Sequence, residues 1–278
     1  MDMIALDAAA DALRSAKAVV FATGAGMGVD SGLPDFRGNE GFWRAYPMLG
    51  NLGVSFAEMA NPRWFAKDPS LAWGFYGHRL MLYRQTTPHD GYAAILRMQE
   101  AGGFELFSYT SNVDGQLQSA GYAEEAIVEC HGSIHHLQCV RSCRERVWSA
   151  DFLEVEVDPK TLRATSEIPP CQHCSSLARP AILMFGDGGW VDVRTNAQFD
   201  RFATFLQRHS GPGLVVLEVG AGVHVPNVRY QSERLMQALG ATLIRVNPRD
   251  PEGPKGTISV RGGGKEALLA IETRVRKG

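Results

Sequence analysis

The sequence predicts an α/β fold, namely a doubly wound parallel (Rossmann-like) sheet with a smaller helical plus zinc-ribbon domain. Three observations predict it. Short apolar, β-branched runs alternate with helical stretches, a glycine-rich turn follows the first of these runs, and four cysteines gather in two close pairs. Such alternation is typical of a parallel sheet that is buried on both faces. With 278 residues and 45% hydrophobic content, the chain is long enough for one large or two modest cores.

The first predicted strand, residues 18–22, follows an amphipathic helix that is expected to run to about residue 16. Gly24, Gly26 and Gly28 come directly after it and let the backbone turn sharply and approach a ligand with no Cβ in the way. A helix that begins near Met27 would direct free N–H groups and its positive dipole end at a pyrophosphate. The spacing differs from the Gly-x-Gly-x-x-Gly of ordinary dinucleotide folds, so a plain structural turn is an open alternative for these glycines alone.

The residues beyond the turn make the interpretation specific. Pro34-Asp35-Phe36-Arg37 places an acid, an aromatic ring and a guanidinium in a loop that is able to cover a bound nucleotide. The stretch from Gly24-Ala25-Gly26 to Ser31-Gly32-Leu33-Pro34-Asp35-Phe36-Arg37-Gly38 resembles the signature of the bacterial-type sirtuins (Sir2-like), the NAD-dependent protein lysine deacylases. The resemblance implies NAD as cofactor, with its pyrophosphate on Gly24, Ala25 and Gly26, and with Asp35, Phe36 and Arg37 in its binding site.

Charge and hydropathy argue against several other classes of function. The formal net charge is −2, which gives no basic field for nucleic acid. No run of about 18 or more apolar residues is present, so neither a membrane span nor a membrane partner is expected. The N-terminus, Met1–Asp7, is acidic and lacks the basic region of a signal peptide, which predicts a cytoplasmic protein.

An aromatic-rich, helix-like region spans about residues 40–85, and most of its rings are expected to form the core of a helical module. Tyr76 and Arg79 lie three residues apart and therefore share one helix face. In the sirtuin resemblance, a Tyr-x-x-Arg pair at this place marks enzymes that bind and remove acidic acyl groups such as succinyl or malonyl. A guanidinium pairs with the acyl carboxylate, and the phenol adds a hydrogen bond. The alternative is an ordinary surface arginine beside a core tyrosine.

Two further predicted strands deliver residues suited to chemistry. Residues 104–109 lead into Thr110-Ser111-Asn112-Val113-Asp114, which resembles the sirtuin Thr-Gln-Asn-x-Asp motif at the carboxyl end of a strand. The resemblance implies that Asp114 holds the nicotinamide carboxamide and that Asn112 is a catalytic residue beside the nicotinamide ribose. Ser111 replaces the family glutamine and cannot reach the ribose in the same way, unless a water takes the missing place. The alternative for the motif is a polar turn after a strand.

Residues 126–130 form the next predicted strand and lead to His131-Gly132. In the resemblance this histidine is the general base of the reaction. An unperturbed imidazole pKa of about 6.5 suits proton removal at neutral pH. The position of His131 after a strand, in the right order behind the two earlier motifs, favours the catalytic role over a structural one.

Four of the five cysteines have the spacing of a metal site. Cys171 and Cys174 form a Cys-x-x-Cys pair, and Cys139 and Cys143 form a pair with three intervening residues. In a chain without an export signal, two close pairs favour a structural zinc ion over disulfides, because four protein ligands leave no open position for catalysis. The alternative is four reduced, unliganded thiols. The stretch between the pairs, residues 144–170, is expected to be an irregular loop.

The C-terminal third is expected to supply the remaining contacts. A strand at residues 180–187 ends in Phe185-Gly186-Asp187, similar to the family Phe-Gly-Glu, and the resemblance implies that Phe185 and Gly186 pair with the substrate peptide as an added strand. Strands at residues 214–219 and 242–247 precede Gly220-Ala221-Gly222 and end at Asn247. The resemblance implies phosphate contacts through the backbone at Gly220 and a contact between Asn247 and the adenosine ribose. Residues 257–260 and Gly262-Gly263-Gly264 precede a last predicted helix at residues 265–274.

Two domains are expected. The NAD-binding domain is predicted to comprise residues 1–38, 86–135 and 180–278, and the small domain residues 39–85 (helical module) and 136–179 (zinc-binding module). The cofactor cleft is expected at the junction of the two domains.

The predicted function is NAD-dependent removal of acyl groups from lysine side chains of proteins or peptides, which gives nicotinamide and O-acyl-ADP-ribose. In the mechanism that the resemblance implies, the acyl carbonyl oxygen attacks C1′ of the ribose, nicotinamide leaves, and His131 removes a ribose hydroxyl proton. Two alternatives stay open. One is ADP-ribosyl transfer or NAD hydrolysis at the same site, which Ser111 favours and His131 disfavours; the other is a non-catalytic NAD sensor or peptide-binding module.

Overall fold

The computed structural model describes residues 1–34, 38–51 and 53–277. Its centre is a sheet of six parallel strands in the order β11-β10-β9-β1-β2-β3. These strands are β1 (Ala18–Thr23), β2 (Glu105–Thr110), β3 (Ile127–Glu129), β9 (Leu214–Val219), β10 (Thr242–Val246) and β11 (Ile258–Val260). The predicted Rossmann-like sheet is confirmed. The predicted cofactor residues Asp35, Phe36 and Arg37 lie outside the described residues.

The direction in which the sheet is built reverses between β1 and β9. From β1 the chain passes to β2 and β3 on one side, and it then crosses to β9 on the other side. The apolar run of β1 is buried along its whole length, as expected for a central strand with both faces covered. Thr23 and Val219 are neighbours at the carboxyl ends of β1 and β9, so the turns after these strands begin side by side. Open α/β sheets bind ligands at such a switch point.

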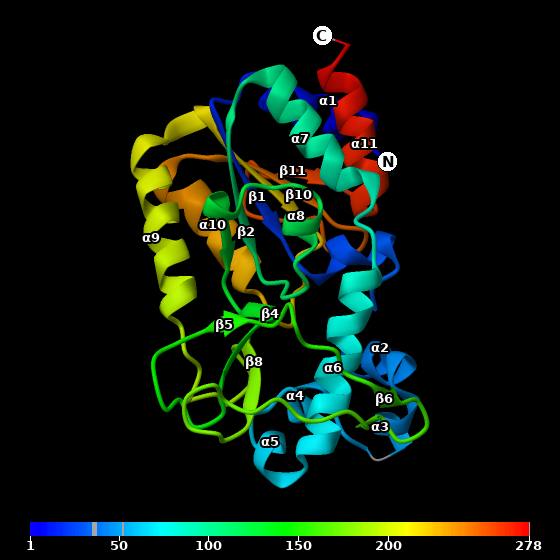
Figure 1. Cartoon of the computed structure of the whole chain (residues 1–278). Coiled ribbons are helices and arrows are strands. Elements are labelled where there is room, and N and C mark those ends of the chain that lie inside the picture. The colour runs from blue at the N-terminus through cyan, green and yellow to red at the C-terminus, as the bar shows by residue number, and fades with distance from the viewer. Residues whose placement is uncertain (35–37, 52, 278) are drawn as a thin grey trace.

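Helices cover both faces of the sheet (Figure 1). One face carries α1 (Met3–Arg14), α7 (Asp90–Gly102) and α11 (Gly264–Val275), and the other carries α9 (Val193–Arg208) and α10 (Asn227–Leu239). Three short helices, α8 (Gln116–Ser119), η2 (Glu124–Ala126) and η3 (Gly211–Gly213), lie in the connections. Within the described ranges, no helix combines the length and apolar character needed to cross a membrane.

A second group of elements occupies the lower half of Figure 1. Its helices are α2 (Gly38–Ala45), α3 (Pro47–Asn51), α4 (Phe56–Met59), α5 (Trp64–Lys67) and α6 (Pro69–Gln85), and its strands are β4 (Gly132–Cys139), β5 (Trp148–Ser149), β6 (Val157–Asp158), β7 (Arg163–Ala164) and β8 (Ala178–Ile182). Buried side chains from these helices and strands form one core, in which Phe42, Trp73 and Phe75 are fully buried. The domain boundaries drawn from the sequence stay a prediction.

Helix α6 begins and ends at residues that favour helix termini. The Asp68 side chain caps its first turn by accepting a hydrogen bond from the Leu71 N–H at 3.2 Å, and Pro69 occupies the first helical position. Thr86, at the other end, has an extended backbone and precedes Pro88 by two residues. The helix therefore has a defined register, which fixes the direction of the side chains on each of its faces.

Two glycines allow close backbone contact on α6. A Cβ at Gly74 would meet the Leu162 carbonyl oxygen at 1.9 Å, and a Cβ at Gly77 would meet the Val155 side chain at 2.2 Å. The segment 155–163, which contains β6 and the first residue of β7, therefore lies directly on the helix. Any side chain at these two positions would push this segment away from α6.

The helix considered near Met27 is present as a 3-10 helix, η1 (Ala25–Ser31), which begins two residues earlier. The Met27 N–H donates to the Gly24 carbonyl at 3.0 Å, three residues back, and Gly32 ends the helix with a left-handed φ of 87°. The glycine-rich sequence has little α-helical propensity, and the tighter turn brings the chain back toward the second half of the signature.

The prediction of a strand over residues 180–187 is wrong in its bounds. β8 ends at Ile182 and pairs antiparallel with β4 in a separate three-stranded sheet of order β5-β4-β8. Gly132 makes this possible, because it has a φ of 74° and a Cβ there would meet the Ala181 carbonyl oxygen at 2.0 Å. Phe185 and Gly186 consequently follow β8 in a turn, away from the parallel sheet.

The segment 144–170 is more ordered than the irregular loop that its composition predicts. It contains β5 and a two-stranded antiparallel pair, β6 with β7. Leu153, Val155 and Leu162 are buried in the same core as α6, which provides the free energy to order the segment.

Candidate active site

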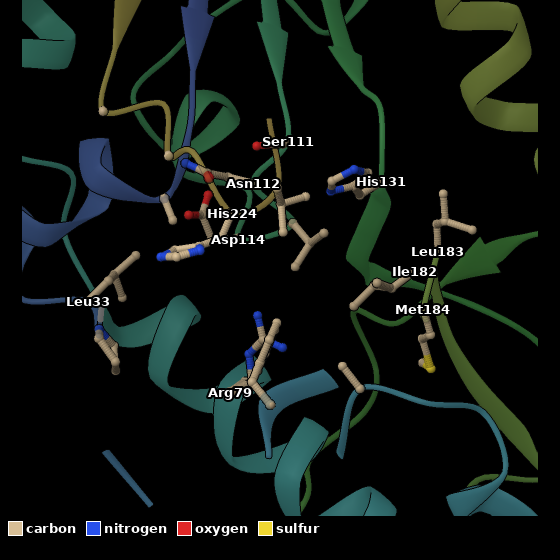
Figure 2. Close-up of a pocket in the computed structure, with 18 of the residues that line it drawn as sticks. Leu33, Arg79, Ser111, Asn112, Asp114, His131, Ile182, Leu183, Met184 and His224 are labelled. Atoms are coloured by element: carbon tan, nitrogen blue, oxygen red, sulfur yellow. The ribbon is translucent and has the colours of Figure 1, made fainter. Parts of the chain in front are cut away.

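A cavity of about 470 Å³ lies at the switch point of the sheet. Its lining residues come from the turns after β1, β2, β3, β9 and β10, from α4 and α6, and from the end of β8 and the segment that follows it. Figure 2 shows Asn112, Asp114 and His131 around this space, with Arg79 extending into it from α6. Segments far apart in the sequence therefore meet at one place.

Two threonines join the ends of β1 and β2 and orient Asn112. The Thr23 hydroxyl donates to Thr110 Oγ1 at 2.8 Å, and the Thr110 hydroxyl donates to the Thr23 carbonyl at 3.2 Å. The Asn112 backbone N–H donates to Thr110 Oγ1 at 3.0 Å, while its side-chain Nδ2 donates to the Gly24 carbonyl at 3.1 Å. The Asn112 side chain is thus fixed to the glycine turn on the wall of the cavity.

Asp114 places a carboxyl group in the cavity. Its Oδ1 accepts a hydrogen bond from the Gln116 N–H at 3.0 Å, and its backbone carbonyl contacts His135 Nε2 at 2.9 Å. Burial raises the pKa of Asp114 to about 6, and the nearby Glu129 acts in the same direction. The Gln116 N–H and the Arg79 guanidinium oppose this shift. At pH 7 the group is mostly a carboxylate, which is able to accept hydrogen bonds from an amide.

His131 lies where the chain leaves β3, and its backbone carbonyl accepts the Leu183 N–H at 2.9 Å. Burial lowers the pKa of the imidazole, and a hydrogen bond to the Ser111 backbone partly opposes this effect. The ring is therefore neutral at pH 7. When one imidazole nitrogen donates to a carbonyl, the other is an acceptor, as a general base requires.

Helix α6 contributes a buried cation surrounded by aromatic rings. The Arg79 guanidinium carbon lies 5.3 Å from the ring centroid of Phe75, 5.9 Å from that of Tyr76 and 5.4 Å from that of Tyr83. Arg79 Nε and Nη2 both donate to the Tyr83 hydroxyl oxygen, at 3.0 and 2.8 Å. The Tyr76 hydroxyl, on a side chain that is 1% exposed, has no hydrogen-bond partner among the described residues.

A buried ion pair holds the turn after β8. Arg179 donates from Nη1 and Nη2 to the two carboxylate oxygens of Asp187, each at 2.8 Å, and both side chains are 1% exposed. Asp187 also accepts hydrogen bonds from the N–H groups of Met184 and Gly189. The aspartate at this position is therefore the centre of the turn that presents residues 183–185 to the cavity.

The turns after β1 and β9 are packed backbone to backbone. The Gly26 N–H donates to the Gly220 carbonyl at 2.9 Å, and a Cβ at Gly24 would meet Ala221 Cα at 2.7 Å. Within the described part of the chain, no carbonyl accepts the N–H groups of Ala25 and Gly222, and both residues line the cavity. Free backbone donors at a glycine turn fit the anionic pyrophosphate of a dinucleotide.

Comparison with known proteins identifies the family. The family model described as the Sir2 family matches residues 24–204. The chain belongs to the Sir2 family. Its resemblance to the sirtuins, seen first in the sequence, is thereby confirmed.

Curated relatives cover almost the whole chain. It is 36% identical over 275 residues to "NAD-dependent protein deacylase 2" of Pyrobaculum aerophilum, which covers 96% of this chain and 95% of the relative. It is 29% identical over 266 residues to "NAD-dependent protein deacylase 1" of Archaeoglobus fulgidus, and this match covers 95% of this chain and 96% of the relative. The predicted class of enzyme, an NAD-dependent protein deacylase, is confirmed for this Sir2 family member.

Solved Sir2 structures share the fold. A complex of a mutant Sir2 homologue with ADP-ribose has a TM-score of 0.72 at 27% identity and covers 100% of this chain and 97% of its own. A complex of a Sir2 homologue with NAD has a TM-score of 0.71 at 27% identity, and the match covers 100% of this chain and 94% of the homologue. NAD as the cofactor, expected from the sequence, agrees with these neighbours.

The four cysteines of the predicted zinc site lie together in this Sir2 protein. The Sγ atoms of Cys139, Cys143, Cys171 and Cys174 all lie within 4.8 Å of one another, with pairs at 3.6 and 3.7 Å. Tetrahedral zinc with Zn–S bonds of about 2.3 Å separates its sulfurs by about 3.8 Å, whereas a disulfide separates them by about 2 Å. The donor set and spacing therefore fit a structural zinc ion, and Cys130 stands apart from it in a buried position.

Most described residues of the predicted Sir2 site line the cavity, and their roles stay predictions. Those that line it are Ala25, Tyr76, Arg79, Ser111, Asn112, Asp114, His131, Phe185 and Gly220. Gly24, Gly26, Gly186 and Asn247 do not line it. Asn247 is 1% exposed, and its side chain bonds the Ala221 carbonyl and the N–H groups of Arg249 and Asp250. Its contact with the adenosine ribose stays a prediction.

The sequence pattern missed several residues that the fold brings to this cavity. They are Leu33, Tyr83, His224, Val225 and Arg249, among others. The spacing of Tyr83, four residues after Arg79, was a usable signal, because such residues are neighbours on a helix. His224 and Arg249 lie in loops after β9 and β10, and no spacing rule connects them to the site.

Proposed function

We propose that this Sir2 family protein removes acyl groups from lysine side chains of proteins, consuming NAD and releasing nicotinamide and O-acyl-ADP-ribose. One observation carries the proposal. Asn112 and Asp114 follow β2, His131 follows the adjacent parallel strand β3, and all three line one cavity with Arg79 and Tyr76 of α6. NAD, when bound there, supplies the ADP-ribosyl group that accepts the acyl group. The protein supplies binding, orientation and a base.

His131 is the residue that we propose as the general base. Its imidazole is neutral at pH 7 because burial lowers its pKa, and its bond to the Ser111 backbone holds the ring in place. A ribose hydroxyl that approaches the other ring nitrogen would transfer its proton to His131. General bases of this kind contribute about 10²- to 10⁴-fold to a rate.

Asp114 and Asn112 are proposed to hold the nicotinamide end. The Asp114 carboxylate accepts hydrogen bonds and so suits the N–H groups of the carboxamide. Asn112 lies beside it, tied through Nδ2 to the Gly24 carbonyl, so its amide oxygen is the end left to face a ligand. Ala25 and Gly222 line the cavity with backbone N–H groups that no carbonyl of the described residues accepts, which supports a pyrophosphate contact there.

Arg79 and Tyr76 are proposed to bind an acidic acyl group. Tyr76 is buried with a hydroxyl that lacks a partner among the described residues, which is unfavourable by about 1–3 kcal/mol unless a ligand satisfies it. Arg79 is a cation in the same wall of the cavity. A succinyl or malonyl carboxylate would pair with the guanidinium and accept the phenol hydrogen.

The substrate chain is proposed to lie across the mouth of the cavity. Leu183 and Phe185 on one side, and Val223 and Val225 on the other, are apolar residues that line the cavity and remain partly exposed. An extended peptide laid between these two segments would cover them and direct its acyl-lysine inward.

Nicotinamide release from NAD by the purified protein tests this function. Peptides of one sequence carrying acetyl-lysine or succinyl-lysine are compared with a reaction without peptide, and the products are identified by mass spectrometry. We expect release that depends on the succinyl peptide, accompanied by O-succinyl-ADP-ribose. The variant Arg79→Met is expected to lose most of the succinyl activity, because it removes the charge.

ADP-ribosyl transfer or NAD hydrolysis is the second candidate. Ser111, a short side chain where the sirtuin motif has glutamine, lines the cavity and is the observation that favours it. Nicotinamide release without loss of the acyl group, or without any peptide, would replace deacylation by this second function. NAD binding without release would leave only a sensor.

A further inference from the structure

Tyr83 is a buried residue of the cavity wall that contacts Arg79 directly. It lies one helical turn beyond Arg79 on α6, and both side chains line the cavity. Its hydroxyl oxygen accepts two hydrogen bonds from the guanidinium, one from Nε at 3.0 Å and one from Nη2 at 2.8 Å. The contact therefore uses the whole edge of the guanidinium that Nε and Nη2 form.

This double contact fixes the plane of the guanidinium. Two hydrogen bonds from a planar fork to one oxygen determine both the position and the rotation of the group. An arginine binds a carboxylate through two parallel hydrogen bonds only when the plane of its guanidinium is aligned with the plane of the carboxylate. Tyr83 is therefore able to determine the orientation in which the Arg79 guanidinium meets an acidic ligand.

Tyr83 also has a hydrogen of its own to donate. Burial raises the pKa of its phenol, so the group is neutral at pH 7 and carries one O–H donor. In the described part of the chain, nothing accepts this hydrogen, although the oxygen accepts from Arg79. Tyr76, two turns earlier on α6, likewise has a buried hydroxyl without a partner among the described residues.

We propose that Tyr83 is a specificity-determining residue, which orients Arg79 and donates its own hydroxyl hydrogen to the carboxylate of an acidic acyl group. Together with Tyr76 it would complete a site of one cation and two neutral donors. This inference rests on the proposed function, and it adds a third residue to the acyl site. An acetyl group ends in a methyl and offers no acceptor at this position, so the contribution of Tyr83 is confined to acidic acyl groups.

The test compares Tyr83→Phe with the wild type and with two other variants. Arg79→Met removes the cation. Tyr122→Phe is the matched control, because it deletes another buried phenol hydroxyl, one that donates to the Tyr92 carbonyl at 2.9 Å away from the cavity. For each protein, kcat/KM is measured with succinyl-lysine and acetyl-lysine peptides of one sequence. The affinity of the succinyl peptide is measured separately by fluorescence anisotropy without NAD.

We expect Tyr83→Phe to lower the ratio of succinyl to acetyl kcat/KM by about 10- to 100-fold, as for the loss of a hydrogen bond to a charged group. The affinity of the succinyl peptide should fall by a similar factor, whereas Tyr122→Phe should leave the ratio at the wild-type value. A general loss of packing would lower both activities together and leave the ratio unchanged, which would overturn the inference.

The two proposals fail in different ways. If Arg79→Met loses succinyl activity while Tyr83→Phe keeps the wild-type ratio and affinity, the inference about Tyr83 is wrong and the proposed function stands. If no peptide is deacylated, the proposed function is wrong. Tyr83 is then judged by anisotropy alone, and succinyl-peptide binding that is equal in wild type and Tyr83→Phe would overturn its role.

Discussion

At the scale of single residues, burial shifts the pKa values of Asp114 and His131, two titratable groups of the cavity, in opposite directions. It raises the pKa of Asp114 to about 6 and lowers the pKa of His131, since in each case the uncharged form is favoured away from water. At pH 7 the result is a carboxylate that accepts hydrogen bonds and an imidazole that accepts a proton. These are the two protonation states that the proposed reaction requires.

Replacing the base tests its role directly. His131→Ala should lower kcat for deacylation by about 10²- to 10⁴-fold, because no other described imidazole bonds the Ser111 backbone at this point. Binding of NAD, measured by calorimetry, should change much less. A variant that removes acyl groups at the wild-type rate would show that His131 is not the base.

The pKa of Asp114 predicts a pH dependence of NAD binding. Because the carboxylate form is the acceptor for the carboxamide, the affinity for NAD should fall as the pH drops below about 6, and by about tenfold between pH 7 and pH 5. Since the folded pKa lies above the ordinary value of Asp, this group makes the free protein less stable as the pH rises from about 4 to 6. Calorimetric titration at pH 5, 6 and 7 measures the affinity. In Asp114→Asn it should be weaker and independent of pH, and an unchanged pH profile in that variant would assign the effect to another group.

At the scale of elements, α6 determines the acyl end of the cavity. Tyr76, Arg79 and Tyr83 are presented from one helix, whose position depends on the segment 155–163 lying against Gly74 and Gly77. This segment lies between the two cysteine pairs, so the cysteine-rich module supports the helix that carries the acyl site. Specificity at one end of the cavity thereby depends on packing outside it.

A substitution in α6 distinguishes helix propensity from packing. Gly→Ala in a helix interior is worth about 1 kcal/mol of stabilisation by propensity alone. Gly74→Ala should nevertheless destabilise the protein by roughly 1–3 kcal/mol, because its Cβ would lie 1.9 Å from the Leu162 carbonyl oxygen. Urea unfolding measures the change. The control is Gly188→Ala, where a Cβ would meet nothing within 4 Å, and a stabilised Gly74→Ala would contradict the close contact.

At the scale of the whole molecule, the cavity exists because two halves of the sheet are wound in opposite directions. The turns after β1 and β9 meet at the switch point, and the second group of elements closes the space from the other side with α6 and the turn after β8. A zinc ion held by the four cysteines would join β4, which begins just after His131, to the residues that lead into β8.

Loss of zinc should therefore weaken the whole second group of elements. Cys171→Ser is expected to release the metal and to lower the melting temperature by several degrees, because a structural zinc site contributes folding free energy. Bound zinc is measured by mass spectrometry and unfolding by calorimetry. Cys130→Ala is the matched control, since this thiol is buried outside the cluster and its loss should leave the zinc content at the wild-type value. Equal zinc content in Cys171→Ser would rule out the site.

Local patterns in the sequence are enough to predict the parallel sheet, the cysteine cluster and the turns after strands that carry Asn112, Asp114 and His131. A buried strand, a residue at its end and a Cys-x-x-Cys pair are all encoded over a few neighbouring residues. The antiparallel pairing of β8 and the order within residues 144–170 depended instead on distant contacts, at Gly132 and Gly74. The same holds for His224 and Arg249, which reach the cavity only once the chain has folded. Local free energies decide which elements form, and long-range packing decides which side chains share one cavity.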